Sequence, residues 1–331
     1  MPKASIVVPA FNSTQTLPET LASLSAQSFD DFEIVVIDDG STDETAQIAE
    51  DHAGRDPRIR VVRQPNRGLA GARNSGIAAA NGEIIGFCDS DDLWHPSKLA
   101  THMDHFDTAP QVGLSYSGSV LIDEHSIQTG HTQSPRLQNI TAAHVFKRNP
   151  IGNGSAPMFR RAALRALAWC PKHEMQRDWV FDETFRQSED IECWLRFALK
   201  TDWQIQGVSG LLTSYRLNAQ GLSANIARQL ETWERMVAKL RPLSPEFFKR
   251  HESAARAYQL RYLARRAVHS QDADTARNLV RRSMQISRAP LIEEPMKTLT
   301  TWAAAQALAR FGDVSFRNAQ SALLSLKPKQ S

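Results

Sequence analysis

The chain has 331 residues, of which 41% are hydrophobic and 23% are charged, and its formal net charge is +3. These proportions are those of an ordinary globular protein and exclude a disordered chain. No run of about 18 apolar residues occurs, which excludes a membrane-spanning helix.

The cysteines and the N-terminus both favour a cytoplasmic protein. Cys88, Cys170 and Cys193 are widely spaced and form no C-x-x-C pair, so we expect reduced thiols rather than a zinc or redox site. The chain runs from Met1 directly into an apolar segment that is too short for the core of a signal peptide. We therefore expect a protein that begins here, in the cytoplasm or at the inner face of the cell membrane.

Charge is unevenly divided along the chain. Residues 225–331 hold 19 Lys and Arg against 9 Asp and Glu, whereas residues 1–224 hold 20 against 27. An acidic first part suits a site for a metal and a nucleotide. A basic second part suits a phosphate-bearing acceptor or an anionic membrane surface. A solvated basic face without any partner explains the second part equally well.

The first hundred residues alternate β-branched runs with helical patterns, which predicts βαβ units and a mostly parallel, Rossmann-like sheet of the α/β class. Each helical pattern begins with Ser, Thr, Asn or Pro, as helix starts commonly do. Strands are predicted at residues 5–8, 33–37, 59–62 and 83–87, and helices near 15–27, 43–53, 69–80 and 96–107.

The pattern changes in the second half of the chain. A fifth strand is expected at 112–122, a polar surface loop at 123–139, a strand at 155–159, a helix at 188–200 and one or two strands within 203–216. From residue 225 onward, apolar residues recur at helical spacing. We therefore predict two domains, 1–224 and an α-helical extension at 225–331. Residues 298–311 could form an interfacial amphipathic helix, although packing within the extension is favoured.

Polar residues follow three of the predicted strands. They are Pro9 to Asn12, the pair Asp38 and Asp39, and the acidic run Asp89 to Asp92. Because ligands of an open α/β sheet bind at the carboxyl ends of its strands, we expect these groups to converge on one crevice. A single acidic pair could instead cap a helix.

The acidic run Asp89-Ser90-Asp91-Asp92 is the densest of these groups. Three carboxylates so close together repel one another, and a cation among them relieves that repulsion. Oxygen ligands favour Mg²⁺ or Mn²⁺, and such an ion bridges the oxygens of a diphosphate. A capping turn before the following helix is the alternative.

Four segments together resemble the successive motifs of family 2 glycosyltransferases: SIVVPAFN at 5–12, VVIDDGSTD at 35–43, GLAGARNSGI at 68–77 and FCDSDDLW at 87–94. This resemblance covers residues 4 to about 222 and implies the A-type glycosyltransferase fold. It leaves the helical extension unexplained.

The resemblance also assigns roles around the donor. Asp39 is implied to bind the base, Arg73 to lie near the pyrophosphate, and Asp89 with Asp91 to form the D-x-D metal motif. Phe11 can stack on a base, as the Tyr that the family more commonly has at this position would. Arg73 could equally serve helix contacts alone. The implied nucleotide-binding residues are Pro9, Ala10, Phe11, Asn12, Asp38, Asp39, Gly68, Arg73, Asp89 and Ser90.

On the acceptor side, Glu189 and Asp190 resemble the family's E-D motif, in which Asp190 is implied to be the general base of an inverting transfer. Both carboxylates would also suit the first turn of a helix that catalyses nothing. The sequence has Asn218 where related motifs often carry His. The implied donor and acceptor pocket contains Asp92, Asn153, Gly154, Ser155, Trp194 and Arg216.

The resulting prediction is a metal-dependent inverting glycosyltransferase. It would move a sugar from a nucleotide-diphosphate sugar, with UDP favoured, to a hydroxyl of a saccharide or lipid-linked saccharide in surface polysaccharide or glycolipid synthesis. A degenerate sugar-nucleotide-binding scaffold at a membrane is the alternative. The absence of G-x-G-x-x-G and of a P-loop argues against redox or kinase chemistry. The aromatic residues of the basic extension do not alternate with its charges, so we expect no nucleic-acid binding.

Overall fold

The computed structural model describes residues 1–172, 177–217 and 226–325, with side chains as far as Phe311. The chain divides into two compact units. The first consists of Met1–Val145 and Asn149–Ala224, and the second of Phe146–Arg148 and Asn225–Ser331. The short segment Phe146–Arg148 thus departs from the predicted first domain. The separate functions predicted for the two domains remain predictions.

The first unit is built around one sheet, which contains nine strands among the described residues. Its order is β3-β2-β1-β4-β8-β6-β9-β5, and β7 pairs with β6. The first four strands of this order are parallel, and β8 is antiparallel to both of its neighbours. The strands are β1 (Ala4–Ala10), β2 (Phe32–Asp38), β3 (Ile59–Arg63), β4 (Ile84–Phe87), β5 (Leu93–Trp94), β6 (Val112–Ile122), β7 (Gln128–Gln133), β8 (Met158–Arg160) and β9 (Gln204–Arg216).

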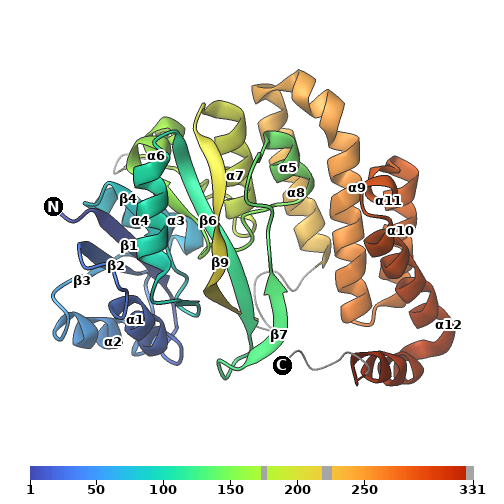
Figure 1. Cartoon of the computed structure of the whole chain (residues 1–331), viewed down its shortest axis with the longest axis horizontal. Coiled ribbons are helices and arrows are strands. Elements are labelled where there is room, and N and C mark those ends of the chain that lie inside the picture. Colours follow the sequence, from blue (N-terminus) through green and yellow to red (C-terminus); the bar gives the residue numbers. More distant parts are fainter. Residues whose placement is uncertain (173–176, 218–225, 326–331) are drawn as a thin grey trace. The chain divides into compact units, whose positions relative to one another are not determined.

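Helices cover both faces of this sheet (Figure 1). Every residue of β1 and β2 is buried, as expected for continuous β-branched runs between two helical layers. Leu17 and Leu21 of α1 join Leu99 and Phe106 of α4 in the same hydrophobic core. The predicted α/β class is therefore confirmed. The helices are α1 (Leu17–Ser25), α2 (Thr45–Ala53), α3 (Gly68–Ala79), α4 (Lys98–Thr108), α5 (Ala142–Lys147), α6 (Arg161–Leu167) and α7 (Glu189–Lys200).

Two strands differ from the sequence-based expectation. Strand β7 lies within the predicted surface loop at 123–139, and its residues are almost all exposed. It contains no apolar alternation that could reveal it, because it forms only by pairing with the edge of β6. Strand β5 is two residues long and pairs with β9, a partner more than a hundred residues away in the sequence.

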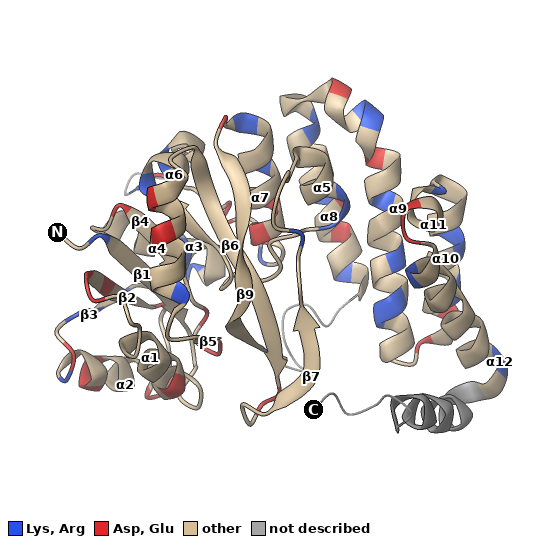
Figure 2. Ribbon diagram, viewed as in Figure 1, with Lys and Arg blue, Asp and Glu red and all other residues tan. Residues whose placement is uncertain are grey.

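The second unit is helical, as predicted. Leu260 and Leu263 of α9 pack against Leu279 and Val280 of α10, while Phe146 stacks on Trp233 with ring centroids 5.8 Å apart. Lys and Arg are distributed along its helices (Figure 2). None of the described helices is both long and apolar enough to cross a membrane. The helices are α8 (Ile226–Leu240), the 3₁₀ turn η2 (Arg241–Leu243), α9 (Pro245–His269), α10 (Ala273–Ile286), α11 (Ala289–Glu293) and α12 (Pro295–Ser325).

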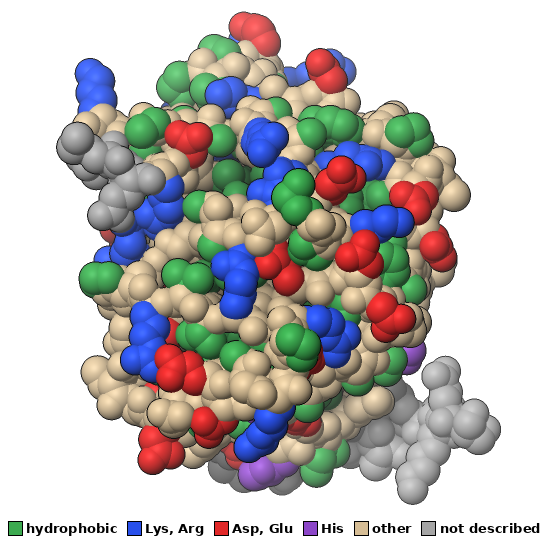
Figure 3. Space-filling model, turned by 90° about the vertical axis from the view of Figure 1, so that its left-hand side faces the viewer, with side chains coloured by type: hydrophobic (Ala, Val, Ile, Leu, Met, Phe, Trp, Pro, Cys, Tyr) green, Lys and Arg blue, Asp and Glu red, His purple; other side chains and the backbone are tan. Residues whose placement is uncertain are grey.

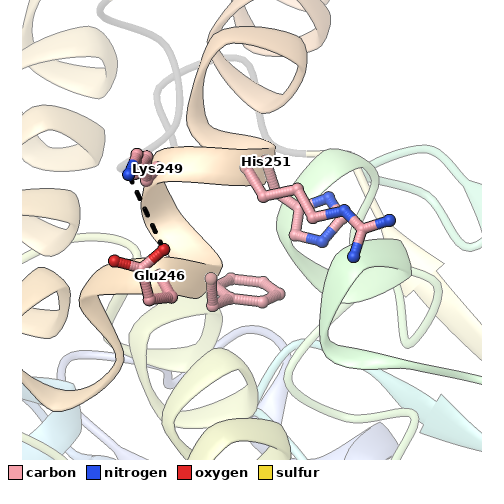
Figure 4. Close-up of a pocket in the computed structure, with 5 residues that line it drawn as sticks. Glu246, Lys249 and His251 are labelled. Atoms are coloured by element: carbon pink, nitrogen blue, oxygen red, sulfur yellow. Dashed lines mark ion pairs between the residues drawn. The ribbon is translucent and has the colours of Figure 1, made fainter.

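The surface carries mixed charges and a small hollow on α9. On the face that Figure 3 shows, acidic and basic side chains are interspersed, and no large patch of one sign forms. A hollow of about 620 Å³ lies at the start of α9 (Figure 4). It is lined there by the Glu246–Lys249 ion pair, with 3.8 Å between Oε2 and Nζ, and by His251.

Candidate active site

The loops after β1 and β2 are tied to each other at the carboxyl edge of the sheet. Asn12, with φ of +48°, accepts a hydrogen bond at Oδ1 from the Thr42 amide at 2.9 Å. Its own amide donates to Ser41 Oγ at 3.1 Å. Phe11 beside it is 49% exposed, so its ring is open to solvent. The Phe11 ring is therefore accessible for the predicted stacking on a base.

Asp39 organises the loop that leads into α3. Its Oδ1 accepts hydrogen bonds from Gln64 Nε2 at 2.6 Å and from the Arg67 amide at 2.8 Å, and its Oδ2 accepts from the Gly68 amide at 2.8 Å. A carboxylate has about four acceptor sites, so one remains for a further donor. Asp38 accepts from the Ser41 amide at 3.1 Å, which fixes the preceding turn.

Gly68 marks a close approach that the sequence alone did not suggest. Its φ is +75°, a conformation that favours glycine. The guanidinium of Arg186 lies directly against its Cα, where a Cβ would collide with Nη1. Arg186 is exposed and comes from the segment just before α7, so its guanidinium could move aside, and the positive φ is what favours glycine at residue 68.

Arg73 of α3 joins the two predicted acidic motifs. Its Nη2 lies 2.8 Å from Asp89 Oδ1, and its Nη1 lies 2.7 Å from Glu189 Oε1. The side chain is only 2% exposed and packs over Phe181, with Cζ 5.4 Å from the ring centroid. The two terminal nitrogens of Arg73 are thus engaged by carboxylates, which places it beneath the site as a bridge.

The three carboxylates of the acidic run do not converge, which corrects the expectation of a cation among all three. Asp92 is fully buried and points inward, where its Oδ2 accepts from Ser155 Oγ at 2.6 Å and its Oδ1 from the Arg216 amide at 2.9 Å. Ser155 Oγ also accepts from the Asp89 amide at 2.9 Å. The Asp92 amide donates to the Asp89 carbonyl at 3.0 Å, so the chain turns between these two residues.

Asp89 and Asp91 remain as the two carboxylates of this run that are half-buried. Burial and the neighbouring charge of Asp89 raise the pKa of Asp91 to about 6. The described residues contain no group of three or more His, Cys, Asp or Glu placed to hold a metal. Mg²⁺, however, is commonly held by one or two carboxylates together with substrate phosphates. Asp89 and Asp91 fit that kind of ligand set, in which a substrate completes the coordination.

Lys98 is a buried cation behind the acidic turn. Its Nζ donates to the Ser155 carbonyl at 2.5 Å and to Thr213 Oγ1 at 2.8 Å, and it lies 4.0 Å from the centroid of the Trp94 ring. Burial lowers its pKa to about 7. Sequence reasoning missed Lys98 because a lysine in the first turn of an amphipathic helix gives no local sign of burial.

Glu189 and Asp190 begin α7. Burial raises the pKa of Glu189 to about 7 and also raises the pKa of Asp190, although the charge of Arg73 opposes both effects. The residue before them, Ser188, has φ of +59°, a strained conformation for a residue that carries a Cβ. Two carboxylates with raised pKa values therefore face the same arginine that holds Asp89.

The remaining predicted pocket residues have different surroundings. Asn153 donates to Ser119 Oγ at 2.9 Å, and Gly154 lies against Arg73 Nη2. Trp194 is 1% exposed and lies in the core, stacked on Phe159 at 5.2 Å between ring centroids. Trp194 belongs to the buried side of α7, so it lies in the interior of the first unit.

Arg216 is held firmly by its neighbours. Its Nε donates to the Asp91 carbonyl at 2.7 Å, and its Nη2 pairs with Glu19 Oε2 at 2.9 Å. Its Nη1 donates to the carbonyls of Asp123 and Glu124. Arg216 therefore connects the acidic turn at residues 89–92 to the turn between β6 and β7. Asn218, which stands where related motifs often carry His, lies outside the described residues.

A further carboxylate that sequence reasoning missed connects α3 to the segment before α7. Glu183 pairs with Arg67 Nε at 2.9 Å and with Arg177 Nη2 at 2.7 Å, and it accepts from Asn74 Nδ2 at 3.0 Å. Asn74 also accepts from the Phe181 amide at 2.9 Å. These contacts hold Glu189 and Asp190 close to α3.

Residues 5–168 match the model of glycosyl transferase family 2. The first unit is a family 2 glycosyltransferase domain. Over 147 residues, or 44% of this chain, it is 33% identical to an uncharacterized glycosyltransferase of Nostoc sp., and the matched segment spans 46% of that relative. The predicted family is therefore confirmed, while Asp190 and Arg216 lie beyond the segment that the family model matches.

Two further comparisons cover more of the chain. Over 231 residues, 70% of this chain and 83% of the relative, it is 29% identical to an Escherichia coli enzyme. That enzyme is the UDP-Glc:α-D-GlcNAc-diphosphoundecaprenol β-1,3-glucosyltransferase WfaP. The mannosyltransferase PcManGT from Pyrobaculum calidifontis, solved with GDP-Man and Mn²⁺, shares the fold with a TM-score of 0.58 at 19% identity. That match covers 93% of this chain and 86% of the other.

Proposed function

We propose that this family 2 glycosyltransferase is a metal-dependent, inverting enzyme that transfers a sugar from a nucleotide-diphosphate sugar to a hydroxyl of a saccharide or lipid-linked saccharide. The observation that carries the proposal is the bridge through Arg73, which holds Asp89 and Glu189 at 2.8 and 2.7 Å. It supports the proposal that Asp89 and the pair Glu189 and Asp190 act on one substrate, from its donor side and its acceptor side.

For the donor, we propose that Phe11 stacks on the base and that the free acceptor site of Asp39 receives a base N–H. Uracil offers such a donor, and the glucosyltransferase WfaP carries UDP-Glc in its name. Asp89 and Asp91 would hold a Mg²⁺ or Mn²⁺. Such an ion, when bound, neutralises charge on the diphosphate as it leaves.

For the acceptor, we propose Asp190 as the general base. The acceptor hydroxyl gives its proton to the Asp190 carboxylate while its oxygen attacks the anomeric carbon from the face opposite the diphosphate. The bond from that carbon to the diphosphate oxygen breaks, and the nucleoside diphosphate departs with the electron pair. The raised pKa of Asp190 supports this role, because it makes the carboxylate a stronger base. Glu189, paired with Arg73, keeps α7 in place.

The class of acceptor is proposed from charge and from the relatives. The basic second unit suits an acceptor with phosphate groups, and WfaP is named for a diphosphoundecaprenol acceptor. We propose a role in polysaccharide or glycolipid assembly, at the cytoplasmic face of a membrane with anionic lipids.

The test measures consumption of UDP-sugars with and without Mn²⁺ or Mg²⁺, across a panel of donors. We expect Asp91→Ala to abolish the metal-dependent reaction. Asp190→Asn should lower kcat by about 100- to 10,000-fold while donor binding persists, as expected for loss of a general base. Asp104→Asn, an exposed carboxylate on α4, is the matched control and should match the native chain. Failure of the native chain to bind or consume any donor would overturn the proposal.

A further inference from the structure

The first turns of α12, the last helix of the second unit, bury two threonines and expose three large apolar side chains, whereas Leu308 further along the helix is buried. In α12, Thr298 and Thr301 are 3% and 7% exposed, and Thr298 Oγ1 donates to the Pro290 carbonyl at 2.6 Å. Met296, Leu299 and Trp302 are 72%, 49% and 43% exposed. A helix that only completes a core shows the opposite distribution. Within the part of the chain that the structure describes, Met296, Leu299 and Trp302 therefore lack the cover that large apolar side chains normally have.

These exposed residues form a stripe rather than isolated positions. Met296, Leu299 and Trp302 follow one another at a spacing of three, which places them along one side of the helix. Ile292, in the short helix α11 just before, is 75% exposed. Single exposed apolar residues need no explanation, whereas a contiguous group marks an interaction site.

The stripe continues into a basic groove between α10 and α12. A hollow of about 590 Å³ lies there, lined by Trp302 and Met284 together with Arg277, Arg281 and Asp274. Both arginines are exposed on α10. Between residues 295 and 311 the sequence contains Lys297 and Arg310 but no Asp or Glu.

Apolar residues flanked by arginines match the chemistry of a bilayer with anionic headgroups. Trp and Leu side chains insert at the boundary between headgroups and acyl chains, and arginine stems extend so that their guanidinium groups reach phosphates. Each basic residue near such a surface adds to binding. A two-fold contact centred on this surface would instead bring the arginines of the two chains close together, which charge repulsion opposes.

We propose that this surface, defined by Met296, Leu299, Trp302, Arg277 and Arg281 and called the α12 surface, binds an anionic phospholipid bilayer. The inference rests on the membrane contact included in the proposed function and gives it a location in the fold. It requires no particular sugar donor, and its residues take no part in the proposed chemistry.

The experiment is co-sedimentation of the full chain with phosphatidylcholine vesicles that contain or lack phosphatidylglycerol. We expect binding only to vesicles with phosphatidylglycerol, and weaker binding at high salt. Met296→Glu with Leu299→Glu should lower partitioning at least tenfold, and Arg277→Glu with Arg281→Glu should do the same. Because all four side chains are exposed, we expect unchanged circular dichroism and thermal unfolding.

The matched control replaces two exposed apolar residues elsewhere, Ile127→Glu with Leu243→Glu, which are 62% and 47% exposed in the native chain. Vesicle binding of this variant should equal that of the native chain. The inference would be overturned by equal vesicle binding of all variants or by stronger binding to an oligonucleotide than to vesicles. It would also be overturned if the native chain formed a dimer that the α12 substitutions dissociate. Donor turnover is measured in parallel with a water-soluble acceptor. Turnover without vesicle binding refutes only this inference, and vesicle binding without turnover refutes only the proposed chemistry.

Discussion

Replacing Gly154 by Ala tests whether the contact between Arg73 and Asp89 sets the geometry of the site. A Cβ at this position would collide with Arg73 Nη2 and lie 3.2 Å from Asp89 Oδ2. Arg73 is buried and bound to two carboxylates, so it cannot swing aside without breaking an ion pair. The new methyl group should therefore displace the acidic turn or the arginine.

The size of the effect follows from packing. An extra methyl group in a well-packed site typically destabilises the folded state by about 1–3 kcal/mol. Replacing glycine by alanine also stabilises a protein by about 0.4–1 kcal/mol, because it reduces the conformational entropy of the unfolded chain. On this balance we expect the free energy of unfolding to fall by up to roughly 2.6 kcal/mol. A displacement near 1 Å at a reacting centre lowers the rate about 100-fold, so kcat should fall by about 10- to 100-fold.

The assay combines urea unfolding with turnover at saturating donor and Mn²⁺. Gly54→Ala is the matched control, because Gly54 follows α2 with an ordinary φ of −66° and its Cβ would meet no atom closer than 3.6 Å. This control should keep native turnover. A Gly154→Ala variant with turnover within about twofold of native and unchanged stability would refute the view that this close packing holds the site.

Two further substitutions test local features of the first unit. Ser188→Gly should raise the free energy of unfolding by up to about 1 kcal/mol in urea unfolding, because glycine adopts the positive φ without strain; Ser188→Ala, which keeps a Cβ, should show no gain. Asp56→Asn tests a pH effect: hydrogen bonding and pairing with Arg58 lower the pKa of Asp56 to about 2. The stability from this shift is present above the unfolded pKa of about 3.9 and is lost as pH falls toward 2. We expect Asp56→Asn to cost at most about 2 kcal/mol at neutral pH and little near pH 2, and a cost independent of pH would contradict this.

Much of the first unit follows from local sequence. The β-branched runs that became β1, β2, β3 and β4 were long enough to predict buried parallel strands, and the helices between them began near the predicted residues. The positions of Asp39 and Asp89 after strands predicted a shared edge of the sheet, because parallel strands end together. Family motifs then assigned chemistry to those positions. Periodicity and strand ends are properties of neighbouring residues, so the sequence expresses them directly.

Only the tertiary structure decided how these residues are used. Arg73 bridges Asp89 and Glu189, and Glu189 is 116 residues away in the chain. Asp92 points inward to Ser155 instead of joining its acidic neighbours, because the chain turns between Asp89 and Asp92. Such pairings depend on side-chain direction and on partners that the fold brings from far away.

The helix α12 shows the same limit in the second unit. Its sequence contains both threonines and large apolar residues at helical spacing, so either side could face the core. The structure buries Thr298 and Thr301 and leaves Leu299 exposed, because Thr298 finds the Pro290 carbonyl as a hydrogen-bond partner. Hydrophobic periodicity determined that this segment is a helix. The shape and the hydrogen-bonding groups of its neighbours determined which side it buries.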